Sequence, residues 1–328
     1  MMLNLTLLEI CRIPLSQIDG EFHLTDFSLT PQDSSLEHTI RKMGLAHPLL
    51  LVRRNGGYGI VSGHRRFRLA TRLNLTDIPA RVIALMGEPD MLETNLTENV
   101  AHKQYSDVEK GLILQKFHAT GMTDVQIMDG IMPLLSLEKS KKLYADFLRI
   151  GNLPSELRLF MHALKMPLRF FSVCFRWDLE NLKAVESLLA LLRPGMNKLR
   201  DLLDLLDETA RREQTTIAEL LSRSGINAVL ENSHLSSHEK YDRIFQEIHQ
   251  QRYPMLSDLK KRVLLSLDKL QLSDKIKIRT AENFENGEIK VEFKFTSREE
   301  LKKYAGQLSA AAESEAMMEL IRVFKENG

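Results

Sequence analysis

The spacing of hydrophobic and polar residues changes twice along the chain. In residues 1–118, short apolar runs at 48–52, 58–61 and 80–85 are typical of buried strands, and they alternate with helical patterns. Residues 119–235 repeat apolar positions at helical spacing only. We therefore predict a small mixed α/β domain at the N-terminus, followed by an all-helical middle domain.

The third stretch, residues 240–328, begins with a helical pattern at 256–270. The segments 275–279 and 288–295 then alternate apolar and charged residues, which is the pattern of half-buried strands. Asn286-Gly287 between them favours a tight hairpin turn. A two-stranded sheet with helices buries its apolar face poorly, so we expect this domain to dimerise or to pack on the rest of the chain. The predicted fold class is α+β and multidomain.

Several short motifs predict where helices and turns begin. Four of the places where a Ser or Thr stands three residues before a Glu or Gln predict helix starts, because in this pattern each side chain bonds the other residue's backbone N–H. These places are Ser34–Glu37, Ser106–Glu109, Thr123–Gln126 and Ser297–Glu300. Asn55-Gly56 predicts the turn of a hairpin between the first two strands.

Breaks in the helical pattern predict the remaining boundaries. Pro133 is expected to end the helix that opens at Thr123, with the next helix running from Leu135 to Ile150. The segment from Asn232 to Glu239, rich in Ser and His, is the best candidate for a linker.

Composition excludes several classes of protein. Lys and Arg number 45 against 44 Asp and Glu, so the formal net charge is +1 and bulk charge neither requires nor excludes a nucleic-acid partner. Two cysteines are too few for a disulfide scaffold or a cysteine-based zinc module. We expect no membrane helix, because no apolar run approaches the roughly 18 residues required. The N-terminal residues lack the features of a secretory signal, so we expect a cytoplasmic protein.

Positive charge is concentrated in one window, from Arg53 to Arg81. The window holds seven arginines and a single acid, Asp77. At its centre an apolar strand pattern ends at Ser62, Gly63 follows, and a helical pattern begins. A helix N-terminus attracts phosphate, and Gly63 lets the backbone approach an anion closely.

Side chains in the same window strengthen this interpretation. Arg65 and Arg66 supply permanently charged, forked donors that match phosphate oxygens. The alternative is a solvated basic helix that pairs with acids elsewhere in the chain. Farther along, Glu98 and Asn99 place a carboxylate beside an amide, a pair that could hold Mg²⁺ together with phosphate oxygens.

The order of these motifs resembles that of the ParB N-terminal domain. The matching segments are Gly44 to Arg53, Ile60 to Arg68 with Gly63-His-Arg-Arg66 as its centre, Ile78 to Val82, and Glu98-Asn99. The run from Thr123 to Ile150, followed by Leu153-Pro154, is similar to the central helix-turn-helix domain of the ParB family. Residues 275–301 resemble its small C-terminal dimerisation domain, so the resemblance covers most of the chain.

The resemblance implies three domains and a function. Residues 1–118 would bind a nucleotide, residues 119–235 would form the helix-turn-helix domain that binds DNA, and residues 240–328 would dimerise. In the family the nucleotide is CTP with Mg²⁺, its binding gates a clamp on DNA, and CTP hydrolysis is possible. The partners would be double-stranded DNA, a ParA-like partition ATPase and a second copy of the chain, and the protein would be associated with the nucleoid during chromosome or plasmid partition.

The resemblance also assigns residues. The nucleotide site would comprise Gly63, His64, Arg65, Arg66, Glu98 and Asn99, with Glu98 and Asn99 as the metal ligands. By position, the DNA-reading helix would be 136–144, with contacts from Lys139, Ser140, Lys141, Lys142 and Tyr144. The alternative for these lysines is an ordinary solvated helix face.

Two histidines depart from the family pattern and keep a second function open. His47 stands where the family commonly has Gln, and His102 ends a box that usually ends in Arg. They favour a static DNA-binding transcriptional or nucleoid regulator on the same scaffold, without nucleotide switching. An enzyme of the related sulfiredoxin type is disfavoured, because Ser62 to Arg65 contains no cysteine.

Overall fold

The structure is a computed structural model that describes residues 8–29, 34–54, 56–280 and 289–325. The chain forms two compact units, Met1–Asp204 and Leu205–Gly328, which we describe separately. The boundary between them falls inside helix α10 (Met196–Glu213). The finer division into three domains remains a prediction.

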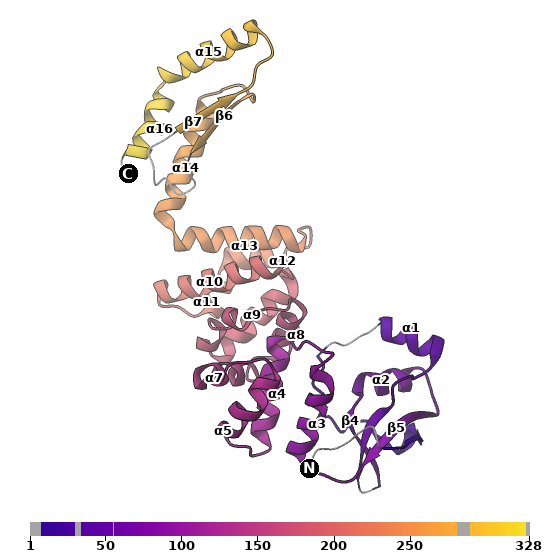
Figure 1. Cartoon of the computed structure of the whole chain (residues 1–328). Coiled ribbons are helices and arrows are strands. Elements are labelled where there is room, and N and C mark those ends of the chain that lie inside the picture. Colours follow the sequence, from indigo (N-terminus) through magenta and orange to yellow (C-terminus); the bar gives the residue numbers. More distant parts are fainter. Residues whose placement is uncertain (1–7, 30–33, 55, 281–288, 326–328) are drawn as a thin grey trace. The chain divides into compact units, whose positions relative to one another are not determined.

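A five-stranded mixed sheet forms the N-terminal part of the first unit (Figure 1). The strands are β1 (Ile10–Pro14), β2 (Ile18–Asp19), β3 (Leu49–Arg54), β4 (Gly57–Ser62) and β5 (Asp77–Ile83). Their order is β1-β5-β3-β4-β2, with β3 antiparallel to β4 and parallel to β5. The three strands predicted from apolar runs are β3, β4 and β5. The edge strands β1 and β2 were not predicted. Four of the five residues of β1 are exposed, so it has no apolar run, and β2 has only two residues.

Helices cover both faces of this sheet. They are α1 (Ser34–Met43), α2 (His64–Arg72) and α3 (Glu88–Val100). Leu51 of β3 belongs to one buried cluster with Ala70 of α2, whereas the next residue, Val52, belongs to another with Met91 of α3. Successive residues of a strand point to opposite faces, which explains why β3 reads as a continuous apolar run. Asn55, in the predicted hairpin turn, lies outside the described residues.

The rest of the first unit is helical. Its helices are α4 (Asp107–Ala119), α5 (Asp124–Gln126), the π turn η3 (Ile127–Ile131), α6 (Met132–Leu134), α7 (Lys141–Ile150), α8 (Ser155–Ala163) and α9 (Leu179–Leu192), and short 3₁₀ turns lie at Leu168–Phe170 and Cys174–Arg176. The capping boxes predicted at Ser106 and Thr123 are both present.

The prediction that Pro133 ends a helix is wrong. The helix that opens at Asp124 continues through η3, and Pro133 lies in the first turn of α6, where a missing N–H is tolerated. The chain leaves the helix at Leu135, and α7 begins only at Lys141. Ser136, in the connection, has a left-handed φ of 56°.

The second unit contains a helical part and a small sheet. Its elements after α10 are α11 (Ile217–Leu221), α12 (Ser224–Glu231), α13 (Ser237–Arg252), α14 (Pro254–Lys269), β6 (Ile276–Thr280), β7 (Ile289–Phe293), α15 (Arg298–Ala312) and α16 (Glu315–Lys325). The strands pair antiparallel, as predicted, although Asn286-Gly287 lies outside the described residues. Val263 of α14 packs with Leu320 and Val323 of α16 beside the sheet.

The predicted linker from Asn232 to Glu239 is shorter than expected. Ser236 caps α13 by accepting from the backbone N–H of Glu239, and its own backbone N–H donates to the Glu239 carboxylate at 2.9 Å. Residues 237–239 therefore belong to a helix. Separately, none of the helices in the described ranges combines the length and apolar character of a bilayer crossing.

Candidate functional site: a cavity at the Gly63 turn

Gly63 carries the chain from β4 into α2 with a left-handed backbone, at φ 108° and ψ 20°. Glycine adopts this conformation readily, whereas a side chain disfavours it. A Cβ at this position would also lie 2.8 Å from Cγ of Leu49. Gly63 has no side chain with which to cap the N-terminus of α2. The predicted arrangement of strand, glycine and helix is present.

A cavity of about 630 Å³ lies beside this turn. Its walls include all six residues that the sequence assigned to a nucleotide site: Gly63, His64, Arg65, Arg66, Glu98 and Asn99. The structure thus brings two separate motifs to one place. His47, Arg81, Asn95 and Lys103 also line the cavity. Sequence reasoning had not assigned these four to the site. His47 and Arg81 stand in segments that carried the family resemblance, whereas no motif contains Asn95 or Lys103.

The end of α3 is fixed against the end of β4 by side-chain amides. Asn95 Nδ2 donates to the carbonyl of Val61 at 2.5 Å. Asn99 Nδ2 donates to the carbonyl of Asn95 at 2.8 Å and lies 3.4 Å from Ser62 Oγ. Because the nitrogen of Asn99 is committed in this way, its Oδ1 is the atom that could serve a metal ion.

Three buried polar atoms of residues that line the cavity have no hydrogen-bond partner among the described residues. They are Oε2 of Glu98, Nε of Arg81 and Oγ of Ser28. Leaving such an atom unsatisfied costs about 1–3 kcal/mol. A cation at Glu98 and an anion at Arg81 would remove this cost. A carboxylate beside an amide oxygen is a donor set that Mg²⁺ accepts, so Glu98 and Asn99 fit a magnesium ion bound together with phosphates.

The arginines of the basic window divide into two groups. Arg65 and Arg66 line the cavity. Arg66 Nη1 also donates to the carbonyls of His47 at 2.9 Å and Pro48 at 2.7 Å, and burial lowers its pKa while the nearby charge of Glu98 opposes the shift. In contrast, Arg68 pairs with Asp26 and Arg72 pairs with Glu37. The alternative of a basic helix that pairs with acids therefore holds for part of α2.

His64 is a buried histidine with a defined partner. Its side chain is 6% exposed, and its Nε2 lies 2.9 Å from Oγ1 of Thr25. Burial lowers the pKa of His64 to about 4, although Asp26 opposes this shift. The ring is therefore neutral at pH 7. It contributes to the cavity as a neutral polar group and adds no charge to it.

The segment 136–144, which was expected to be the DNA-reading helix, is helical only from Lys141 onward. Lys139 and Ser140 precede α7, where Lys139 pairs with Asp129 at 3.1 Å and Ser140 caps the helix by accepting from Leu143 N–H. Lys141 and Lys142 lie exposed in the first turn. Tyr144 is 4% exposed, and its hydroxyl lies 3.3 Å from His118 Nδ1. Tyr144 is thus a core residue of this helical part, which disfavours the DNA contact expected from its position in the sequence.

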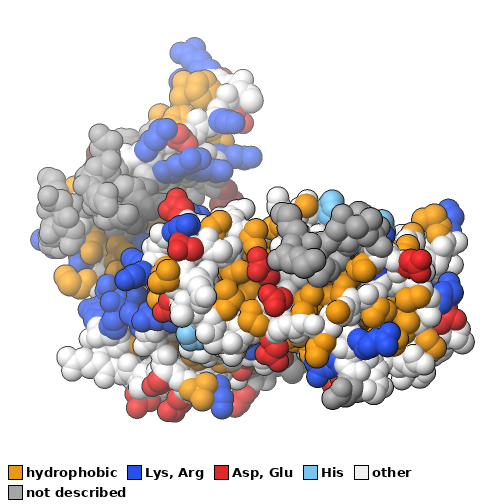
Figure 2. Space-filling view, turned by 60° about the horizontal axis from the view of Figure 1, so that its bottom comes forward, with side chains coloured by type: hydrophobic (Ala, Val, Ile, Leu, Met, Phe, Trp, Pro, Cys, Tyr) orange, Lys and Arg blue, Asp and Glu red, His pale blue; other side chains and the backbone are white. Residues whose placement is uncertain are grey.

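The surface carries charges of both signs. Figure 2 shows acidic and basic side chains interspersed on the face in view, with apolar side chains between them. This distribution agrees with the net charge of +1. A net charge this close to zero gives no overall positive field that would attract nucleic acid.

The mixed sheet, the left-handed turn at Gly63 and the cavity lined by arginines form the N-terminal part of the chain. Residues 6–100 match the family model of the ParB N-terminal domain. The resemblance deduced from the motifs of this part of the chain is therefore confirmed.

Curated relatives match parts of the chain. A chromosome-partitioning protein Spo0J of Thermus thermophilus is 31% identical over 121 residues, which are 37% of this chain and 42% of that protein. A nucleoid occlusion protein of Halalkalibacterium halodurans is 29% identical over 109 residues, which are 33% of this chain and 38% of that protein. The chain thus spans about two fifths of the length of these relatives.

Solved structures were also found. A C-terminally truncated chromosome-partitioning protein ParB from Caulobacter crescentus, complexed with CTP-gamma-S, covers 55% of this chain and 92% of its own, at 20% identity and a TM-score of 0.23. The same protein complexed to the centromeric parS site covers 64% of this chain and 95% of its own, at 15% identity and a TM-score of 0.31.

Proposed function

We propose that this chain is a ParB-type DNA-binding partition protein whose N-terminal domain binds CTP together with Mg²⁺. The observation that carries the proposal is that Gly63, Arg65, Arg66, Glu98 and Asn99 line the same cavity. In its wall, Glu98 Oε2 and Arg81 Nε have no hydrogen-bond partner among the described residues. The family match over residues 6–100 supports it. CTP is chosen over other nucleotides on the family resemblance alone.

Each residue would act on the triphosphate in a definite way. The N–H groups after Gly63 would donate to phosphate oxygens, and Arg65, Arg66 and Arg81 would neutralise their charge. Glu98 and Asn99 would hold Mg²⁺, which when bound would supply further neutralisation of the triphosphate. Because Arg66 already ties α2 to the carbonyls of His47 and Pro48, it would also keep the cavity wall in position.

The remaining parts of the proposal follow the family. Lys139, Ser140, Lys141 and Lys142 would contact duplex DNA, and the second unit would dimerise. CTP would gate the closure of the dimer into a clamp on DNA, with hydrolysis as a possible reset, and a ParA-like ATPase would be the partner. The site of action would be the cytoplasmic nucleoid, in chromosome or plasmid partition.

Arg66→Ala tests the proposed site, with the exposed Arg53→Ala as its matched control. Loss of a charge-assisted contact is worth roughly 1.5–3 kcal/mol, so calorimetry should show about 10- to 150-fold weaker CTP binding for Arg66→Ala and unchanged binding for Arg53→Ala. Arg66 also stabilises the fold, so the thermal midpoint must be measured in parallel. Equal affinities in the two variants would remove Arg66 from the site.

The static DNA-binding regulator remains the second candidate. One observation favours it. Arg66 Nη1 already donates to two backbone carbonyls, so this nitrogen has no further hydrogen to donate to a ligand. One measurement distinguishes the two functions. Specific DNA binding that is unchanged by CTP, in a folded protein that binds no nucleotide, would select the static regulator.

A further inference from the structure

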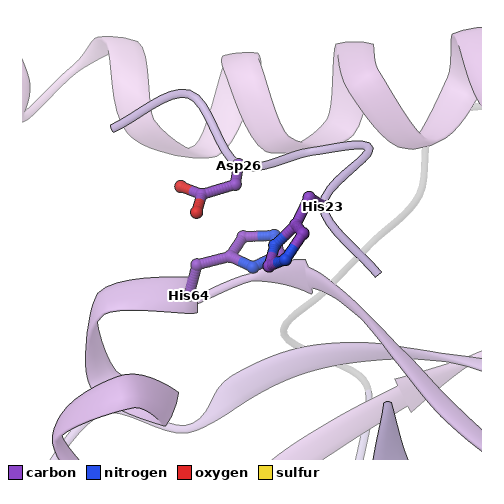
Figure 3. A group of neighbouring side chains, drawn as sticks. All are labelled: His23, Asp26 and His64. Carbon is purple, nitrogen blue, oxygen red and sulfur yellow. The ribbon is translucent and has the colours of Figure 1, made fainter. Parts of the chain in front are cut away.

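Three side chains beside the cavity converge in a way that nucleotide binding does not require. His23, Asp26 and His64 each offer one ligand atom, and these atoms all lie within 4.8 Å of one another (Figure 3). His64 begins α2, whereas His23 and Asp26 come from the segment that follows β2. His64 is buried, Asp26 is half-buried and His23 is exposed.

The hydrogen bonds around His64 fix which ring nitrogen carries the proton. Thr25 Oγ1 donates its only hydrogen to the carbonyl of Ile60 at 2.7 Å. Its contact with His64 Nε2 at 2.9 Å must therefore be one in which Nε2–H donates. The neutral ring then has its lone pair on Nδ1. A second ring nitrogen held by a hydrogen bond is the usual state of a metal-binding histidine.

Asp26 and the segment that bears it are also held in place. Asp26 Oδ1 accepts from the backbone N–H of Ser28 at 3.2 Å, and Oδ2 accepts from Arg68. Lys116 of α4 donates to the carbonyls of His23, Leu24 and Asp26 at 2.6, 2.8 and 2.9 Å. Two ligands are thus fixed before any ion arrives, which reduces the entropic cost of binding. His23, near Glu21 at 3.6 Å and exposed, can rotate toward the other two.

We propose that His23, Asp26 and His64 form a binding site for a zinc-type transition-metal ion. Two imidazoles and one carboxylate are the ligands of three-residue zinc sites, which keep a fourth position open for water or another ligand. Ligand atoms of such a site stand about 3.3 Å apart, given metal–ligand bonds of about 2.0–2.1 Å and tetrahedral angles. Rotation of the exposed His23 side chain would bring its ring nitrogen closer to the ligand atoms of Asp26 and His64, which now lie within 4.8 Å of it.

The surrounding charges decide which metal the site prefers. Arg68 and Lys116 face Asp26, so their two positive charges offset the single negative charge of this carboxylate. A hard, strongly hydrated ion such as Mg²⁺ would therefore be bound weakly here. Imidazole nitrogen instead favours Zn²⁺, Ni²⁺ or Cu²⁺. The site therefore differs in chemistry from Glu98 and Asn99, whose oxygen atoms suit Mg²⁺. The two sites lie side by side, because Asp26 and His64 also line the nucleotide cavity.

Titration of the full chain with Zn²⁺, and with Co²⁺ as a visible probe, tests the proposal. We expect one ion per chain and the intense absorption of four-coordinate Co²⁺. His23→Ala, at an exposed position that should not affect folding, should weaken binding by about tenfold or more, because losing a ligand costs at least as much as losing an outer partner. Asp26→Asn should act in the same direction.

Two matched controls locate the ion. His38→Ala removes an exposed histidine of α1 and should leave Zn²⁺ affinity unchanged. Glu98→Gln should also leave it unchanged, since that carboxylate belongs to the proposed magnesium site. Unaltered affinity in His23→Ala would overturn the proposal, and so would weakened Zn²⁺ binding in Glu98→Gln or in His38→Ala.

Discussion

Gly111 of α4 lies directly against the backbone of Phe147 in α7. A Cβ on Gly111 would stand 2.7 Å from the Phe147 carbonyl oxygen and 2.9 Å from Cβ of Ile150. The absence of a side chain is therefore what allows the two helices to approach so closely. The N-terminus of α7 carries Lys141 and Lys142, so this contact also positions the charges proposed to meet DNA.

Gly111→Val should destabilise the first unit. The new side chain meets a backbone atom that cannot rotate away, and overpacking of this kind costs about 1–3 kcal/mol. Gly130→Ala is the matched control, because its added Cβ would meet no described atom within 4 Å beyond its own stretch of helix. Urea unfolding followed by circular dichroism compares the two. A Gly111→Val variant as stable as the control would show that α4 and α7 do not pack as described.

The first turn of α7 should contribute to DNA binding through charge alone. Changing Lys141 and Lys142 to Ala together should weaken binding and reduce the slope of log K against log salt by up to about 2, if each meets one phosphate. Lys183→Ala, an exposed lysine on α9, serves as the control and should leave the slope unchanged. A slope unaffected by the double change would place the DNA interface elsewhere.

Exposed apolar residues on β7 and beyond it should form part of a dimer interface. Val291 is 39% exposed and Phe295 is 51% exposed, although both belong to the apolar pattern of the strand. Changing both to Asp should convert a dimer to a monomer in sedimentation experiments, because a carboxylate is costly to bury. Val125→Asp, at a site that is 60% exposed in the first unit, should leave the dimer intact. A double variant that remains dimeric would move the interface to another surface.

Stability should fall in mild acid because of His64. Its pKa is lowered from 6.5 to about 4, so the unfolded chain binds this proton more readily than the folded chain does. The contribution is complete above the unfolded pKa and is lost as pH falls toward the folded pKa, a loss of about 2 kcal/mol between pH 7 and pH 5. Chemical unfolding at both pH values, with a chelator present, should show a smaller loss for His64→Gln than for wild type. His38→Ala should keep the full loss.

Local patterns predicted much of the fold. The run from Leu49 to Val52 was correctly predicted as a buried strand, because every residue in it faces one of two covered sides. The capping boxes at Ser106 and Thr123 were predictable because the two partners of each box lie within four residues of sequence. Pro133 was misjudged, because a π turn lets the helix continue past it, and no residue pattern predicts that turn.

The site was predictable only where its residues belong to motifs. Gly63, Arg66 and Glu98 were identified from two short segments that the fold then brings to one cavity. Arg81 and Asn95 could not be assigned, because they meet the cavity through the pairing of β5 and the packing of α3. The convergence of His23 and Asp26 on His64 depends in the same way on tertiary contacts, above all on those of Lys116.

Calorimetric titration of the full-length protein with CTP, ATP, GTP and UTP, each with and without Mg²⁺ and in the presence of DNA, tests the central claim most directly. The account predicts that CTP binds and that its binding requires Mg²⁺. Glu98→Gln should reduce this Mg²⁺ dependence. Glu93→Gln, which changes an exposed carboxylate on the same helix, should leave it unchanged. Failure of all four nucleotides to bind at millimolar concentration to folded protein would contradict it.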